Sequence, residues 1–280
     1  MDMTEQKNDF GVGSVEQNII RMAVPMTVAQ ILNLLYNLVD RMYIGHIPGA
    51  SSLALTGVGI TFPIISMITA FANLFGMGGA PLCSMARGRR DYDAAKRYMQ
   101  NAFWMLLAAG VVLTVTGYVI EKPLLYALGV SSVTYPYASS YLRIYLLGNM
   151  FVMVGIGMNP FINAQGFGTM GMVTVGLGAL VNIILDPLFI FVFHMGVEGA
   201  AIATIIAQFL SALWVLFFLT GEKPDLRLKI IRIPTEITTQ MAADIFHYLF
   251  CLFKIIRANR HGIGCMKTAV FHIRFHDFIF

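Results

Sequence analysis

Long uncharged stretches are the feature that most limits how this chain can fold. No Asp, Glu, Lys or Arg occurs in 22–39, 42–86, 98–120, 123–142, 144–185 or 199–221. A helix needs roughly 20 mainly apolar residues to cross a bilayer, so the two longest stretches are each long enough for about two crossings. Only 12% of the residues are charged, against about a quarter in soluble domains. The chain is therefore predicted to be an all-α polytopic membrane protein.

The same pattern predicts six transmembrane helices that form one bundle. They are expected at about 20–46, 54–85, 98–120, 138–163, 169–193 and 199–220. The domain organisation that follows is a cytoplasmic N-terminal segment at 1–18, the bundle at 19–221, a cytoplasmic basic loop at 222–240 and an atypical tail at 241–280. The N-terminal segment is acidic and lacks the basic flank and cleavage site of a signal peptide, so it is expected to be retained.

Basic residues are distributed unequally between the two sides of the predicted bundle. The opposite side from the N-terminus holds Arg41, Lys122 and Arg143. The side of the N-terminus holds eleven: Lys7, Arg21, Arg87, Arg89, Arg90, Lys96, Arg97, Lys223, Arg227, Lys229 and Arg232. Because Lys and Arg favour the cytoplasmic side, we expect a multi-pass protein of the plasma (cell inner) membrane with a cytoplasmic N-terminus. These juxtamembrane residues also account for the net charge of +4, so the lipid bilayer is predicted as a partner and nucleic acid is not.

Residues 241–280 depart from the pattern of the rest of the chain. Their longest uncharged stretch, 245–253, is far shorter than a membrane span. They hold two of the three cysteines and four of the six histidines, at 247, 261, 272 and 276. The irregular spacing predicts neither a metal site nor a disulfide framework, and no resident cofactor is expected. We interpret this tail as out-of-frame or replaced sequence.

Two acidic residues interrupt the apolar spans, Asp40 in the first and Asp186 in the fifth. A carboxylate at the centre of a membrane helix costs about 2.5–3.5 kcal/mol. At a rise of 1.5 Å per residue, Asp40 lies roughly 30 Å from the cytoplasmic start of its helix and Asp186 roughly 26 Å. Both helices run in the same direction, so both carboxyl groups are expected at a similar level in the outer half of the membrane.

Each acidic residue has an amide on its own predicted helix face, Asn37 at i−3 from Asp40 and Asn182 at i−4 from Asp186. The two pairs could form one polar cluster. Two simpler interpretations stay open: Asp40 could pair with Arg41 at the outer interface, and Asp186 could bond backbone groups freed by the following proline. An ionisable residue within a membrane nevertheless indicates function by default.

The chemistry that such a cluster predicts is cation coupling. Burial disfavours the charged form of a carboxyl group, so it can bind a proton and release it when the site is hydrated. Carboxylate, amide and hydroxyl oxygens could equally hold Na⁺, and both uses occur at transporter sites near the membrane midplane. The residues themselves do not choose between H⁺ and Na⁺.

Three segments resemble the multidrug and toxic compound extrusion (MATE) family, in the order found there. They are PMTVAQILNLLYNLVDRMYIG, GMGGAPLCSMARGRRDYDAAKRY and LVNIILDPLFIFVFHMGVEGAAIATIIAQ, and the likeness covers roughly residues 15–230. The resemblance implies an antiporter that exports small cationic lipophilic compounds in exchange for H⁺ or Na⁺. It also implies two related six-helix bundles that face a central cavity.

The resemblance further implies which residues bind the coupling cation. The amino-terminal bundle of the family carries a site that falls here on Asp40, Asn182, Asp186 and Thr204, with Tyr141 as a neighbour. The family pattern ends after about residue 230, so the chain corresponds to an amino-terminal bundle that is truncated or frameshifted. Such a half is expected to act as a homodimer or with a missing second bundle.

Three other functions are less well supported by the sequence. An inactive fragment would insert and transport nothing. A lipid-linked-sugar flippase of the same superfamily would be expected to line its cavity with several basic residues, and the predicted spans have almost none. An intramembrane aspartyl protease usually carries Tyr-Asp and Gly-x-Gly-Asp, whereas the contexts here are Val39-Asp40 and Leu185-Asp186. No enzyme is therefore expected.

Overall fold

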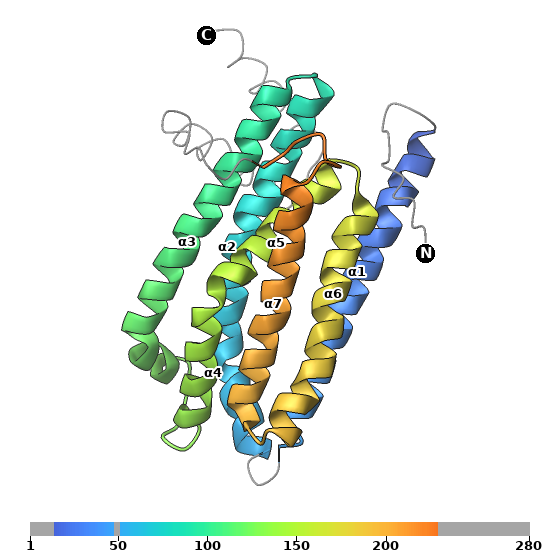
Figure 1. The fold of residues 1–280 in the computed structure, drawn as a ribbon. Helices are drawn as coiled ribbons and strands as arrows, with labels where there is room; N and C mark the ends of the chain where they lie inside the picture. Colours follow the sequence, from blue (N-terminus) through green and yellow to red (C-terminus); the bar gives the residue numbers. More distant parts are fainter. Residues whose placement is uncertain (1–13, 48–50, 229–280) are drawn as a thin grey trace, which may run out of the picture. The chain divides into compact units, whose positions relative to one another are not determined.

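The computed structural model describes residues 14–47 and 51–228, and within these residues every regular element is a helix (Figure 1). The elements are α1 (Val15–Ile44), α2 (Ser51–Gly88), α3 (Tyr92–Ala127), α4 (Tyr135–Leu147), α5 (Asn149–Ala164), α6 (Gly168–Pro187), the π-helical segment η1 (Leu188–Val192) and α7 (Gly196–Thr220). In this part of the chain, five helical stretches are individually long and apolar enough to cross a membrane, and there are six if the bent α4–α5 pair is counted as one span. The prediction of an all-α polytopic membrane protein is confirmed. The predicted tail at 241–280 lies outside the described residues.

Helix boundaries extend beyond the apolar stretches where the sequence offers a cap. The helix α1 begins five residues before its predicted start, because the Ser14 hydroxyl accepts a hydrogen bond from the backbone N–H of Gln17 at 3.3 Å. Asp91 does the same for α3, accepting from the backbone N–H of Ala94 at 2.9 Å. Such caps satisfy backbone donors that have no partner inside the helix, so polar residues join the helix ahead of the membrane span.

The fourth predicted span is not one straight helix. The helices α4 and α5 meet at an angle of 59° around Gly148. A Cβ placed on Gly148 would lie 2.5 Å from the side chain of Ile205 on α7, so glycine lets this corner pack tightly against α7. The fifth predicted span is also irregular, because α6 passes into η1 directly after Pro187.

Each helix of the bundle packs against particular neighbours (Figure 1). The helix α1 lies along α6, α2 packs against α3 and α5, and α7 packs against α4, α5 and α6. Small residues permit the closest crossing: a Cβ on Gly76 of α2 would lie 2.4 Å from the backbone oxygen of Gly157 on α5. The side of α1 that faces away from the other helices exposes apolar side chains such as Ile20, Leu34 and Leu38, as expected of a surface that meets lipid.

The segment after α7, at 221–228, folds back onto the helix ends on the side where α2 ends and α6 begins. The backbone N–H of Leu226 donates to the side-chain oxygen of Gln165 at 2.9 Å, and Leu226 is fully buried. Arg87 of α2 donates to the backbone oxygen of Ala164 at 3.0 Å and lies 3.7 Å from the Asp225 carboxylate. We call 221–228 the closing segment, because it joins the ends of α2, α5 and α7.

Candidate cation-binding site

The helices α6 and α7 bring three of the predicted site residues into one hydrogen-bonded group. The Asn182 amide nitrogen donates to a carboxylate oxygen of Asp186 at 3.1 Å, one helical turn further along α6. The same nitrogen lies 3.4 Å from the hydroxyl oxygen of Thr204 on α7. Thr204 in turn donates to the backbone oxygen of Ala200 at 3.0 Å. The amide of Asn182 therefore links the acidic residue to the neighbouring helix.

The fourth predicted residue, Asp40, reaches this group from α1. Because α1 lies along α6, the carboxyl groups of Asp40 and Asp186 interact with each other electrostatically. An ionised carboxylate can only accept hydrogen bonds, so two such groups facing each other repel unless a proton or a cation stands between them. The arrangement of two facing acidic groups is therefore suited to binding a positive charge.

Three side-chain oxygens in this cluster are buried and have no hydrogen-bond partner among the described residues. They are Asp40 Oδ1, Asn182 Oδ1 and Asp186 Oδ2. Buried acceptors in proteins are nearly always satisfied, and three such oxygens in one place therefore call for a donor or a cation. Together with the Thr204 hydroxyl they form a set of oxygen ligands typical of a hard cation, and the carboxyl groups can alternatively hold a proton.

The backbone around Asp186 departs from regular α-helix at the site. Asp186 is fully buried, and the hydrogen bond that it accepts comes from the Asn182 side chain rather than from the backbone freed by Pro187. The simpler interpretation of Asp186 as a backbone partner therefore finds no support in the described residues. The segment η1 begins two residues after it, and π-helical turns within helices are frequent at functional sites.

The predicted pairing of Asn37 with Asp40 is wrong. The Asn37 amide nitrogen donates instead to the backbone oxygen of Asn33 at 2.7 Å and to its side-chain oxygen at 3.1 Å. An asparagine on a helix can bond a group one turn earlier, and here this contact competes with the contact to Asp40. The Arg41 guanidinium lies 4.6 Å from the centre of the Phe62 ring, which is a cation–π contact. The sequence had suggested Asp40 as the partner of Arg41, and the structure shows this ring as a further partner.

Tyrosines complete the surroundings of the cluster. Tyr141 of α4 is buried and faces Thr204 and Asp40, as the resemblance implied for a neighbour. Tyr145, one turn further along α4, stacks on Tyr141 with ring centres 6.2 Å apart. Tyr36 was not among the predicted site residues, and in the structure it interacts electrostatically with Asp40 and Asp186. Its position four residues before Asp40 on the same helix face was the signal that could have found it.

Comparison with known proteins agrees with this architecture. The family model described as MatE matches residues 25–188, which include both Asp40 and Asp186. The chain belongs to the MatE family. The family consists of transporters and not of enzymes.

Among curated relatives, the multidrug export protein MepA of Staphylococcus haemolyticus is 27% identical over 242 residues, which is 86% of this chain and 53% of the relative. MepA of Staphylococcus aureus strain MRSA252 is 26% identical over 214 residues, covering 76% of this chain and 47% of the relative. The chain thus spans about half the length of the curated relatives that it matches.

Solved structures share the fold of the bundle. A structure described as MATE in the straight conformation superposes with a TM-score of 0.75 at 25% identity, over 88% of this chain and 55% of the other. A transporter of the MOP superfamily from Pyrococcus furiosus superposes with a TM-score of 0.77 at 24% identity, over 88% and 54%. The described helices therefore share their fold with about half of each of these solved structures.

Proposed function

We propose that this bundle forms the cation-coupling half of an antiporter that exports small cationic lipophilic compounds in exchange for H⁺ or Na⁺. The observation that carries the proposal is the meeting of Asp40 and Asp186 beside Asn182 and Thr204, with three buried oxygens left without partners. The names of the MepA relatives, which describe multidrug export, support the choice of transported compounds.

The coupling step follows from the charge of the site. Two facing carboxyl groups bind a proton or Na⁺ from the side of the membrane where that ion is abundant. When the site opens to the other side and is hydrated, the carboxylates are stabilised by water and the ion leaves. Binding of a cationic compound elsewhere in the cavity is then favoured by the negative charge that remains.

A second bundle is part of the proposal, because the curated relatives are about twice as long as the region they share with this chain. We propose that this second bundle is a continuation of the same protein or a second copy of this chain. The proposed location is the plasma membrane, with the N-terminus in the cytoplasm, as the distribution of basic residues favours.

The test measures ion binding and transport with one conservative substitution. Asp186→Asn keeps the shape and removes the charge. In the purified full chain, we expect the affinity for ²²Na⁺ to fall by more than about a hundredfold, because a direct charged ligand is lost. Proton release on addition of Na⁺ should need a correspondingly higher Na⁺ concentration. In proteoliposomes Asp186→Asn is expected to abolish efflux of a cationic dye driven by an ion gradient, with membrane insertion intact.

The matched control is Asp93→Asn, which neutralises an exposed carboxylate in the first turn of α3. It is expected to leave ion binding and dye efflux unchanged. If Asp186→Asn retained gradient-driven efflux or bound the ions as the unchanged chain does, the assignment of the coupling site would be wrong. A chain that binds the ions and does not transport them would point to a missing second bundle.

A further inference from the structure

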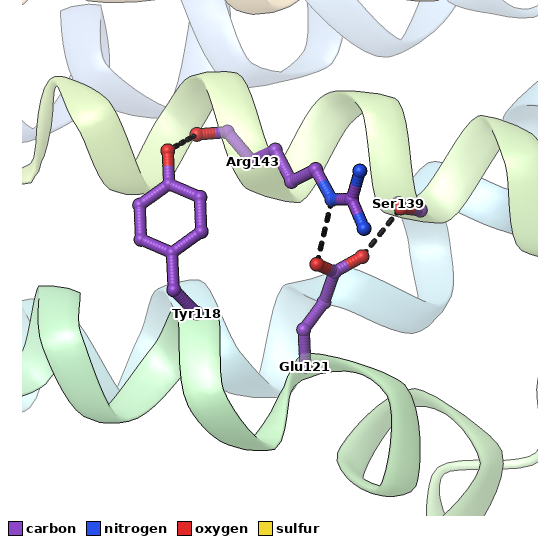
Figure 2. A network of polar contacts seen from close by, with 4 residues as sticks. All are labelled: Tyr118, Glu121, Ser139 and Arg143. Atoms are coloured by element: carbon purple, nitrogen blue, oxygen red, sulfur yellow. Dashed lines mark hydrogen bonds and ion pairs between the residues drawn. The ribbon is translucent and has the colours of Figure 1, made fainter.

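A second buried carboxylate, Glu121 of α3, lies outside the cation cluster and joins α3 to α4 (Figure 2). Glu121 is 4% exposed. One of its carboxylate oxygens accepts a hydrogen bond from the Ser139 hydroxyl, and the other accepts from the Arg143 guanidinium at 2.7 Å. The Tyr118 hydroxyl, one turn before Glu121, donates to the backbone oxygen of Arg143 at 2.7 Å. All three bonds run between the same two helices.

The residues bound by Glu121 lie on one face of α4, and Tyr141 lies on the other. Ser139 and Arg143 are four residues apart, so both point toward α3. Tyr141 stands midway between them, about 200° around the helix from each. Tyr141 is buried where α4 packs against α7, the helix of Thr204, and it interacts there with Thr204 and Asp40. Although α4 also packs against α2 and α7, the hydrogen bonds to Glu121 lie where they can influence which residue α4 presents to the cation cluster.

The neighbouring helix cannot fix this rotation by itself. At Gly148 the α4–α5 pair bends by 59°, so α4 is a short separate helix rather than the continuation of α5. A rotation of α4 about its axis would move Tyr141 away from Thr204 while leaving α5 in place. Hydrogen bonds to a charged group are among the stronger ones in proteins, and Glu121 makes two of them on α4.

We propose that Glu121 is a positioning residue of the cation site, holding α4 in the rotation that directs Tyr141 to Thr204 and Asp40. This inference rests on the proposed function for its consequence, namely that ion binding depends on Glu121. The claim that Glu121 holds the rotation of α4 does not depend on that function. Glu121 itself touches no residue of the cation cluster in the contacts described above, so it acts through α4.

The geometric part is tested by cross-linking in the full chain with its native cysteines replaced. Cysteines introduced by Tyr141→Cys and Thr204→Cys are joined by a short bifunctional methanethiosulfonate, with and without Glu121→Ala. We expect Glu121→Ala to slow cross-linking severalfold and Glu121→Gln, which keeps the shape and an acceptor for Arg143, to restore most of the rate. The control pair Leu32→Cys and Gly176→Cys joins α1 to α6 and is expected to react unchanged.

The functional part is tested by a double-mutant comparison of ion binding, with ²²Na⁺ and protons as the probes. Glu121→Ala is expected to weaken binding about three- to tenfold, the effect of losing one hydrogen bond at the site. In a Tyr141→Phe background, Glu121→Ala should weaken ion binding by less than about a further twofold, because the effects of residues that act through one another do not add. Lys122→Gln, an exposed charge change at the next residue, should have no effect.

The outcomes separate the two proposals. Unchanged cross-linking in Glu121→Ala, or an equal loss of ion binding with and without Tyr141→Phe, would overturn the positioning role and leave the cation site intact. Ion binding that does not depend on Asp186 in the unchanged chain would overturn the proposed function, and with it any role of Glu121 in ion binding.

Discussion

Thr204 shows how a single hydroxyl serves two purposes within a membrane helix. It donates to the backbone oxygen of Ala200 on its own helix and lies within hydrogen-bond range of the Asn182 amide. The first contact satisfies the hydroxyl proton locally, which leaves the oxygen free to accept from the Asn182 amide and to offer a second lone pair to a cation. Thr204 can therefore act as a ligand without an unsatisfied donor in the membrane.

Replacement of this hydroxyl should affect ion binding and not folding. Thr204→Val keeps the branched shape and removes the oxygen, so we expect ion affinity to fall about three- to tenfold, the effect of one lost hydrogen bond. Thr204→Ser keeps the oxygen and should bind within about twofold of the unchanged chain. The measurement is ²²Na⁺ and proton binding to the purified full chain, and equal affinity in the Val and Ser variants would exclude Thr204 as a ligand.

At the same scale, the sequence predicted some contacts and not others. The pair Asn182 and Asp186 was predictable because residues four apart lie on one helix face, and the structure confirms the pair at 3.1 Å. Asn37 did not pair with Asp40 in the same way, because Asn33 offers two acceptors one turn earlier. Local spacing shows which partners are within reach, and it does not show which of them is chosen.

Among the elements, the crossing of α2 and α5 depends on glycine. A Cβ on Gly76 would lie 2.4 Å from a backbone oxygen of α5 and 3.0 Å from the Cα of Gly157. Backbone atoms cannot move aside as a flexible side chain can, so any larger residue must separate the two helices. Membrane helices gain their association largely from such close packing.

Gly76→Ala is therefore expected to destabilise the bundle by about 1–3 kcal/mol, the usual cost of overpacking. The measurement is the thermal unfolding midpoint of the purified chain in detergent. The control is Gly59→Ala on the same helix, where a Cβ meets nothing within 4 Å and where alanine favours the helix. A midpoint in Gly76→Ala as high as in the control would show that the crossing has room to adjust.

The closing segment depends on one buried side chain. Gln165→Ala removes the acceptor of the Leu226 backbone N–H, and an unsatisfied buried donor costs about 1–3 kcal/mol. We expect amide hydrogen exchange in 221–228 to become at least about fivefold faster, with little change in α6. The control is Thr220→Ala. Among the residues that the structure describes, the Thr220 hydroxyl bonds its own helix at Leu216 and Phe217, so its loss should leave exchange unchanged. Equal exchange in both variants would contradict the role of Gln165.

For the whole molecule, the distribution of basic residues makes a prediction about orientation that the fold alone does not. In a chain with its native cysteines replaced, Ser132→Cys should react with an impermeant maleimide added to intact cells. Asp93→Cys, equally exposed, should react only after the membrane is permeabilised. The reverse pattern would place the N-terminus outside and would contradict the positive-inside argument.

The amino-acid sequence alone was enough to predict a membrane bundle of helices and the approximate places of its apolar stretches, as the described helices confirm. The physical reason is that the hydrocarbon core demands continuous apolar helices of a fixed length, which is a property of each stretch alone. The MATE resemblance added Thr204, whose own surroundings in the sequence are those of an ordinary packing residue.

Only the tertiary structure decided which groups face each other. It brought Asp40 to Asp186, turned Asn37 toward Asn33, and divided the fourth span at Gly148 so that α4 presents Tyr141 to Thr204. These outcomes depend on the rotation of each helix and on its distance from its neighbours. Both are set by contacts between residues far apart in the chain, such as Gly76 with Gly157 and Gly148 with Ile205, and no local pattern contains them.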